Sequence, residues 1–182
     1  PWKDGFGYDT SASIYLDPNI FKPGIYFLNK IPIIIKKNLE SKSDFLIVLP
    51  TNTMAAYTSL GGKSFYRDYV GDGIRSDVLS FLRPYRTYKE HKGGEKLRVK
   101  PGMRWLYNQG YDINFITDYD MDNKNIVLNS DVIIIVGHSE FWSRKARQNF
   151  DFHVDCGKNA LILSGNTMWK QVRYEDFGKT IF

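Results

Sequence analysis

The sequence predicts an α/β protein built on a parallel sheet with helices on both faces. It contains four short apolar runs: FLIVLP, INFIT, VIIIVG and ALILSG. Such uninterrupted aliphatic runs are typical of parallel strands that are buried on both faces. Helix-like segments at 99–110 and 141–157 lie between the later runs, as expected where crossover helices join parallel strands.

Composition restricts the class of protein. The 182 residues are enough for one domain with a core, and 42% hydrophobic and 25% charged residues are usual for a globular chain. The net charge of +5 is spread along the chain without a basic stripe interleaved with aromatics, so we expect no nucleic-acid partner. The apolar runs are too short to span a bilayer. The single cysteine, Cys156, excludes an internal disulfide and a Cys-rich zinc site.

The N-terminal part is expected to be a separate β element. The runs PGIYFL and IPIIIKK predict a hairpin around Asn29-Lys30, and Pro32 indicates an edge strand. We expect residues 1–40 to end a small β module that precedes an α/β domain at 41–182. The chain starts at Pro1 and stops at KTIF, so we expect the domain to be truncated at its C-terminal end. The compartment stays open, with a cytoplasmic location slightly favoured.

The segment from 51 to 100 is long and irregular. A helix is expected over 73–82 and a polar excursion over 87–97. The later helical segments end at Gly110 and Gly157, which are common C-terminal stops. In the second, the spacing of four predicts one buried face, formed by Trp142, Ala146, Phe150 and Val154.

Polar side chains follow each predicted strand. Open α/β sheets bind ligands outside the carboxyl ends of their strands. The candidates are Tyr57, Asp118, His138, Glu140 and Asn166. Each also has a structural interpretation, as a helix-end charge, a loop hydrogen bond or a solvated turn, so the case depends on their convergence. GHSEF is not a nucleophile elbow because Phe141 stands where a Gly is needed, and GGKS lacks the upstream Gly of a P-loop.

Five ordered motifs carry a family resemblance: LPTNTMAAYTSLGGKSFY, FLRPY, RWLYNQGYDINFITDYDMD, VGHSEFWS and LILSGNTMWKQVRYE. Over about residues 24–176 the chain resembles the large-subunit (beta) family of N,N-dimethylformamidase. The resemblance implies a core similar to class I glutamine amidotransferases, of flavodoxin-like type, without their cysteine. It also implies a mononuclear iron held by two tyrosines and one glutamate.

By position in the motifs, Glu140 and Tyr57 match two of these ligands. Tyr26 is our candidate for the third, with Tyr15 and Tyr66 as competitors. The chain departs from the family pattern beside the expected ligands, where it has Thr58, Leu60 and Phe141. These neighbours shape the pocket, so the substrate stays open.

The donor set favours Fe(III). Ionising a tyrosine of pKa about 10 at pH 7 costs roughly 4 kcal/mol, which a trivalent ion offsets better than a divalent one. We therefore expect an iron-dependent hydrolase of small amides, in which metal-activated water attacks the amide carbonyl. His138 or Asp118 would move protons, and Asn166 or backbone N–H groups of 137–140 would stabilise the oxyanion. Phe65, Trp142 and Trp169 would line a small apolar pocket.

Two alternatives remain. The first is a non-catalytic module on the same fold that binds a sugar or a peptide through its aromatic strand exits. The second is an iron(II) or zinc site made by His138, Glu140 and Asp118. The expected partners are a small amide substrate and either a small subunit or further copies of the chain.

Overall fold

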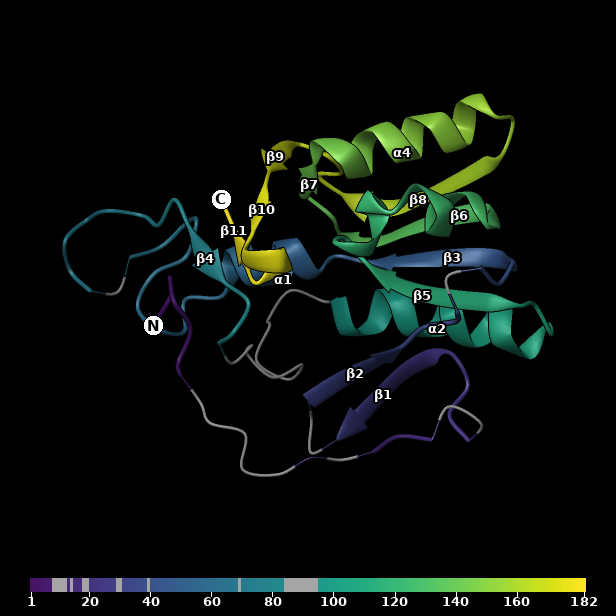
Figure 1. Cartoon of the computed structure of the whole chain (residues 1–182), viewed down its shortest axis with the longest axis horizontal. Coiled ribbons are helices and arrows are strands. Elements are labelled where there is room, and N and C mark those ends of the chain that lie inside the picture. Colours follow the sequence, from purple (N-terminus) through teal and green to yellow (C-terminus); the bar gives the residue numbers. More distant parts are fainter. Residues whose placement is uncertain are drawn as a thin grey trace.

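The computed structural model shows a mixed α/β architecture with one parallel sheet and several short antiparallel pairs (Figure 1). The structure describes residues 1–7, 13, 15–17, 20–28, 31–38, 40–68, 70–83 and 95–182. Within these residues, no helix is long and apolar enough to cross a membrane.

The central sheet consists of the four predicted strands. They are β3 (Ser43–Leu49), β5 (Ile113–Thr117), β6 (Ser130–His138) and β8 (Asn159–Gly165). Their order is β5-β3-β6-β8, and every neighbouring pair is parallel. Val48 of β3, for example, aligns with Ile116 of β5 and Ile135 of β6. The prediction of four neighbouring parallel strands is confirmed.

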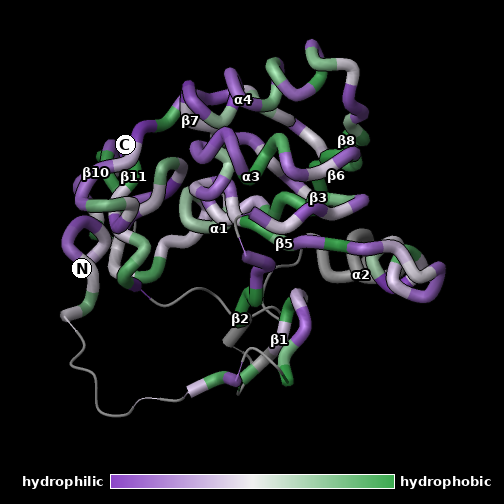
Figure 2. The backbone as a smooth tube through the Cα atoms, turned by 45° about the vertical axis from the view of Figure 1, so that its right-hand side comes forward, coloured by the Kyte–Doolittle hydropathy of each residue, from purple (hydrophilic) through white to green (hydrophobic). Residues whose placement is uncertain are grey.

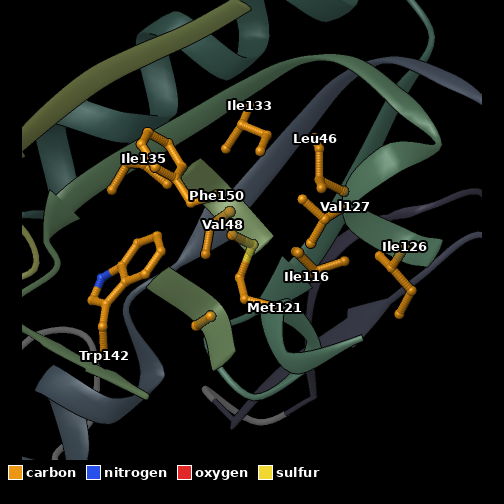
Figure 3. Close-up of a cluster of buried hydrophobic side chains, with 11 residues drawn as sticks. Leu46, Val48, Ile116, Met121, Ile126, Val127, Ile133, Ile135, Trp142 and Phe150 are labelled. Atoms are coloured by element: carbon orange, nitrogen blue, oxygen red, sulfur yellow. The ribbon is translucent and has the colours of Figure 1, made fainter. Parts of the chain in front are cut away.

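One face of the sheet packs against the short helix η1 (Asp120–Asp122), α3 (Lys124–Leu128) and α4 (Arg144–Asp155). Figure 3 shows side chains from these elements meeting those of β3, β5 and β6. Leu46, Val48 and Ile133 are fully buried there, together with Met121 and Val127. The sheet carries the hydrophobic runs, whereas α4 is mainly hydrophilic with single hydrophobic positions (Figure 2).

The opposite face is covered by α2 (Glu95–Asn108) and by the hairpin of β1 (Gly24–Leu28) and β2 (Ile31–Ile35), which lie below the sheet in Figure 1. Ile25 and Ile34 of the hairpin pack against a cluster that includes Ile47 and Ile134. β1 and β2 are antiparallel, which confirms the hairpin, although Asn29 and Lys30 lie outside the described residues.

A group of short elements lies beyond the carboxyl ends of the strands. Helix α1 (Thr51–Tyr57) directly follows β3, and β7 (Phe141–Ser143) pairs in parallel with β9 (Lys170–Val172). A small antiparallel sheet has the order β10-β11-β4 and comprises β4 (Leu79–Ser80), β10 (Tyr174–Glu175) and β11 (Thr180–Ile181), with η2 (Asp176–Gly178) before β11.

The helix expected over 73–82 is wrong. This segment is extended and bent, and β4 is its only regular element. Serine side chains bond nearby backbone groups instead of leaving them to a helix: the Val78 N–H donates to Ser76 Oγ at 3.3 Å, and the Leu82 N–H donates to Ser80 Oγ at 3.0 Å. Residues 87–94 of the expected polar excursion lie outside the described part of the chain, and its last residues, 95–97, begin α2.

The predicted face of α4 is correct for Ala146 and Phe150 and wrong for Val154, which is 42% exposed. His153 takes the inward position in the last turn, because its two ring nitrogens lie 3.1 Å from the carbonyl oxygens of Val127 and Asn159. Cys156, expected to pack on the next strand, is exposed.

Strand β8 differs from its expected burial. It pairs with β6 on one side, and among the described residues no strand pairs with its outer edge. Leu161, Ile162 and Leu163 are 45%, 50% and 56% exposed, so neither face of the sheet is fully covered at this strand. The run ALIL has the composition of an inner strand but forms an edge.

Candidate functional site

The candidate site lies where the sheet order changes direction. After β3 the chain adds β5 on one side and then returns to add β6 on the other. In open parallel sheets this switch point leaves a crevice at the carboxyl ends of the two strands, and ligands bind there. Here those ends lead into α1, which ends at Tyr57, and into the segment that carries His138 and Glu140.

The oxygen-bearing side chains of Tyr57, Tyr66 and Glu140 meet at one place. Glu140 is only 1% exposed. The Tyr57 hydroxyl donates a hydrogen bond to Glu140 Oε2 at 2.9 Å, and the Tyr66 hydroxyl donates to Oε1. The two tyrosine rings lie against each other with centroids 4.4 Å apart. One carboxylate therefore accepts hydrogen bonds from both phenolic hydroxyls.

The backbone of Glu140 is fixed by neighbouring strand ends. Gly137 has φ +74°, a value that glycine adopts without strain, and β6 ends one residue later at His138. The Ser139 N–H then donates to Ser164 Oγ, and the Glu140 N–H donates to Thr53 Oγ1, both at 2.9 Å. Glu140 is thus tied to β8 on one side and to α1 on the other.

Tyr66 reaches the carboxylate from the loop after α1. The N–H of its neighbour Phe65 donates to Ala56 O at 3.1 Å, which returns the loop to the helix. Lys170 Nζ lies 5.3 Å from the centre of the Tyr66 ring. Burial, followed by the hydrogen bond to Glu140, raises the pKa of Tyr66, so its phenol holds its proton when no ion is bound.

His138 and Asn166 border this cluster. His138 Nε2 lies 3.3 Å from Glu140 Oε2, 3.4 Å from the Tyr57 hydroxyl and 3.4 Å from Asn166 Nδ2. Asn166 follows β8 with φ +49°, a conformation that Asn tolerates better than most residues. The structure therefore brings together four predicted site residues: Tyr57, Glu140, His138 and Asn166.

Tyr26 is not part of this cluster. Its hydroxyl donates to Lys22 O at 2.8 Å, and its ring lies edge-on to Phe21 at 5.3 Å. The hairpin that carries it packs on the α2 face of the sheet, away from α1 and β7 (Figure 1). Tyr66, one of the two competitors, is the second tyrosine at Glu140, while Tyr15 is 84% exposed.

Asp118 is hydrogen-bonded to the start of α1. It is 1% exposed, and its Oδ2 accepts the Asn52 N–H at 2.8 Å, which holds the first turn of α1. Its Oδ1 has no hydrogen-bond partner among the described residues. Burial raises the pKa of Asp118 to about 8.

The metal site suggested from His138, Glu140 and Asp118 is contradicted. Within the described part of the chain, no three His, Cys, Asp or Glu side chains are placed to hold a metal ion. The cluster at Glu140 has a different donor set, with two phenols and one carboxylate.

The three expected pocket aromatics do not line one pocket. Trp142 is 3% exposed and belongs to the core, where its Nε1–H donates to Ser139 Oγ at 2.8 Å. Trp169 is 67% exposed, and both tryptophans line a surface depression between β7, α4 and β9 that does not include Phe65. Phe65 alone lies beside the cluster, packed on Phe141 with ring centroids 5.5 Å apart.

A protein-family model described as "N,N-dimethylformamidase beta subunit-like, C-terminal" matches residues 13–181. The chain belongs to this family. The resemblance found in the five sequence motifs is therefore confirmed. The comparison with curated proteins found no match. Membership in the N,N-dimethylformamidase beta subunit-like family agrees with a hydrolase and with a domain that works as one subunit of an assembly.

Two residues that organise the site were missed from the sequence. Thr53 accepts the Glu140 N–H, but a threonine in a seven-residue helix gives no periodic signal. Arg83 binds the loop between the two tyrosines, and the FLRPY motif in which it stands was its only sequence signal.

Proposed function

We propose that the chain is the iron-binding part of a hydrolase that cleaves C–N bonds in small amides, as its family name suggests. The observation that carries the proposal is the convergence of Tyr57, Tyr66 and Glu140. Helices on both faces of a parallel sheet support the further proposal of a glutamine amidotransferase-like core.

The donor set fits a hard trivalent ion. Two phenolic oxygens lie within hydrogen-bonding distance of the two carboxylate oxygens, so all three side chains already point to one place. Phenolate and carboxylate are hard oxygen donors. Tyr57, Tyr66 and Glu140 would hold Fe(III), which when bound would polarise an amide carbonyl and lower the pKa of water.

The surrounding residues would provide proton transfer and orientation. His138 lies at the cluster with about a third of its side chain exposed, so it can exchange a proton with both substrate and solvent. Asn166 Nδ2, next to His138, can donate to an oxyanion. The backbone N–H groups of Ser139 and Glu140 are unsuited to this role, because Ser164 and Thr53 already accept them.

The substrate expected from this geometry is small, since Phe65 and Phe141 pack closely beside the tyrosines. The family name describes a subunit, so we propose a small subunit or further copies of this chain as partners.

The test is metal analysis and amide hydrolysis on the purified protein. An Fe(III)–phenolate site absorbs visible light, so wild-type protein should be coloured and should contain one iron per chain. Glu140→Ala and Glu140→Gln should lose both iron and activity, because the first removes the carboxylate and the second its charge. Cys156→Ser, at an exposed position, should change neither. If Glu140→Ala keeps its iron, the carboxylate is not a ligand.

A second candidate is a ligand-binding module without catalysis. A depression of about 320 Å³ is lined by the exposed Trp169 and by the basic side chains of Arg144, Arg147 and Lys170. Exposed aromatics beside polar groups suit a sugar or a peptide. A colourless, metal-free wild-type protein that binds such a ligand would favour this function over the first.

A further inference from the structure

We infer that Arg83 is the positioning residue that holds Tyr57 and Tyr66 at Glu140, by binding the carbonyl groups of the segment that joins them. Arg83 is 5% exposed. It donates five hydrogen bonds to backbone carbonyls, those of Ala55 (2.6 Å), Thr58 (2.8 Å), Ser80 (2.9 Å), Lys63 (3.1 Å) and Leu60 (3.2 Å).

The first group of Arg83 contacts binds carbonyl groups at the C-terminal end of α1. The last carbonyls of a helix have no partner within it and carry partial negative charge. Helix α1 has no basic residue in its last turn. Arg83 supplies a positive charge from a distant part of the chain, through Nη2 to the carbonyl of Ala55, two residues before Tyr57, and through Nη1 to that of Thr58, one residue after it.

The second group of contacts fixes the loop that leads to Tyr66. Nη1 also binds the carbonyls of Leu60 and Lys63, so one planar group spans the path from the first tyrosine to the second. Nε binds Ser80 in β4, which pairs with β11. The loop is therefore anchored to the small sheet.

Lysine cannot replace this arrangement. A guanidinium presents several N–H groups in one rigid plane, whereas an ammonium is a point charge on a flexible stem. Arg83→Lys keeps the positive charge, but its ammonium carries three N–H groups on one atom and cannot bind all the carbonyls that Nε, Nη1 and Nη2 reach. The two tyrosines should then lose their common orientation toward Glu140 while the parallel sheet stays intact.

The first experiment uses metal-free protein labelled with 3-fluorotyrosine and observed by fluorine NMR. Tyr57→Phe and Tyr66→Phe assign the two signals. In Arg83→Lys these two signals should shift and broaden, and those of the other tyrosines should not. The control is a core variant, Ile133→Val or Val127→Ala, chosen because it lowers the melting temperature by the same amount as Arg83→Lys does. Unchanged signals in folded Arg83→Lys, or equal changes in the control, would overturn the inference.

The second experiment measures Fe(III) binding and rests on the proposed function. Arg83→Lys should weaken binding at least tenfold relative to the matched control, and equal affinities would overturn the inference. If the wild type binds no iron, the proposed function fails, while the NMR result still decides the role of Arg83.

Hydrogen exchange on the unaltered chain covers the case in which Arg83→Lys does not fold. The N–H groups of Thr58, Gly62 and Phe65 all bond within the segment bound by Arg83. They should exchange with one common protection factor as a single unit. Exchange at Gly62 a hundredfold faster than at Phe65 would show that the loop opens without the guanidinium, and would refute the inference.

Discussion

Replacing Asp118 by Asn should remove a large pH dependence of stability. The carboxyl is fully buried, and its pKa is raised by burial to about 8 from an ordinary value of 3.8. Between these values the folded chain keeps a proton that the unfolded chain has released. The free energy of unfolding therefore falls as the pH rises from about 4 to about 8. At about 1.4 kcal/mol per pH unit, the loss over this window is at most about 6 kcal/mol.

Asn keeps the shape and still accepts the Asn52 N–H, but it cannot ionise. Urea unfolding followed by circular dichroism, at pH 4.5 to 8.5, should show Asp118→Asn gaining on the wild type as the pH rises. Ile135→Val is the control, since it should cost about 0.5–1.5 kcal/mol at every pH. A difference between Asp118→Asn and wild type that is constant with pH would show that the buried carboxyl ionises normally, and would refute the argument.

Three further outcomes are expected. Tyr66→Phe should lower iron content at least tenfold, whereas Tyr26→Phe should not. An equal loss of iron in both variants would show that Tyr66 is not preferred over Tyr26 as the second tyrosine ligand. Because the Tyr57 and Tyr66 hydroxyls donate hydrogen bonds to Glu140 and the pKa of Tyr66 is raised, both phenols carry protons that iron must displace, and iron uptake should release about two protons at neutral pH; pH-dependent affinity measurements showing no rise with pH would contradict this. Thr53→Val should leave the buried Glu140 N–H unpaired and cost about 1–3 kcal/mol in urea unfolding, and a loss below about 0.5 kcal/mol would mean that another group accepts it.

The sequence was sufficient for the sheet because buried parallel strands have a local signal. Runs such as VIIIVG need only their own composition to be recognised, and the helices before β5 and β8 are each followed two residues later by a glycine with positive φ, Gly110 and Gly157. The prediction over 73–82 was wrong, because Ser76 and Ser80 bond the backbone there where a helix was expected.

The site was predictable only in part, since it depends on contacts between distant segments. Glu140 and Tyr57 each follow a strand that was predicted to belong to one parallel sheet, so their convergence at the carboxyl ends of the strands could be expected. The choice between Tyr26 and Tyr66 could not, because it depends on which face of the sheet the hairpin covers. The role of Arg83 depends on five carbonyl groups, and a backbone carbonyl has no residue-type signature in a sequence.

The exposed edge of β8 bears on the behaviour of the chain in concentrated solution. No strand of the described residues pairs with its outer side, which there presents a row of peptide groups, and Leu161 and Ile162 offer apolar surface beside them. An edge of this kind is a template for strands of other molecules. Self-association should therefore accelerate steeply with protein concentration, and a charged residue at Ile162 should slow it by acting as a gatekeeper. The edge strand β8 is thus also a surface through which two molecules of the chain can associate.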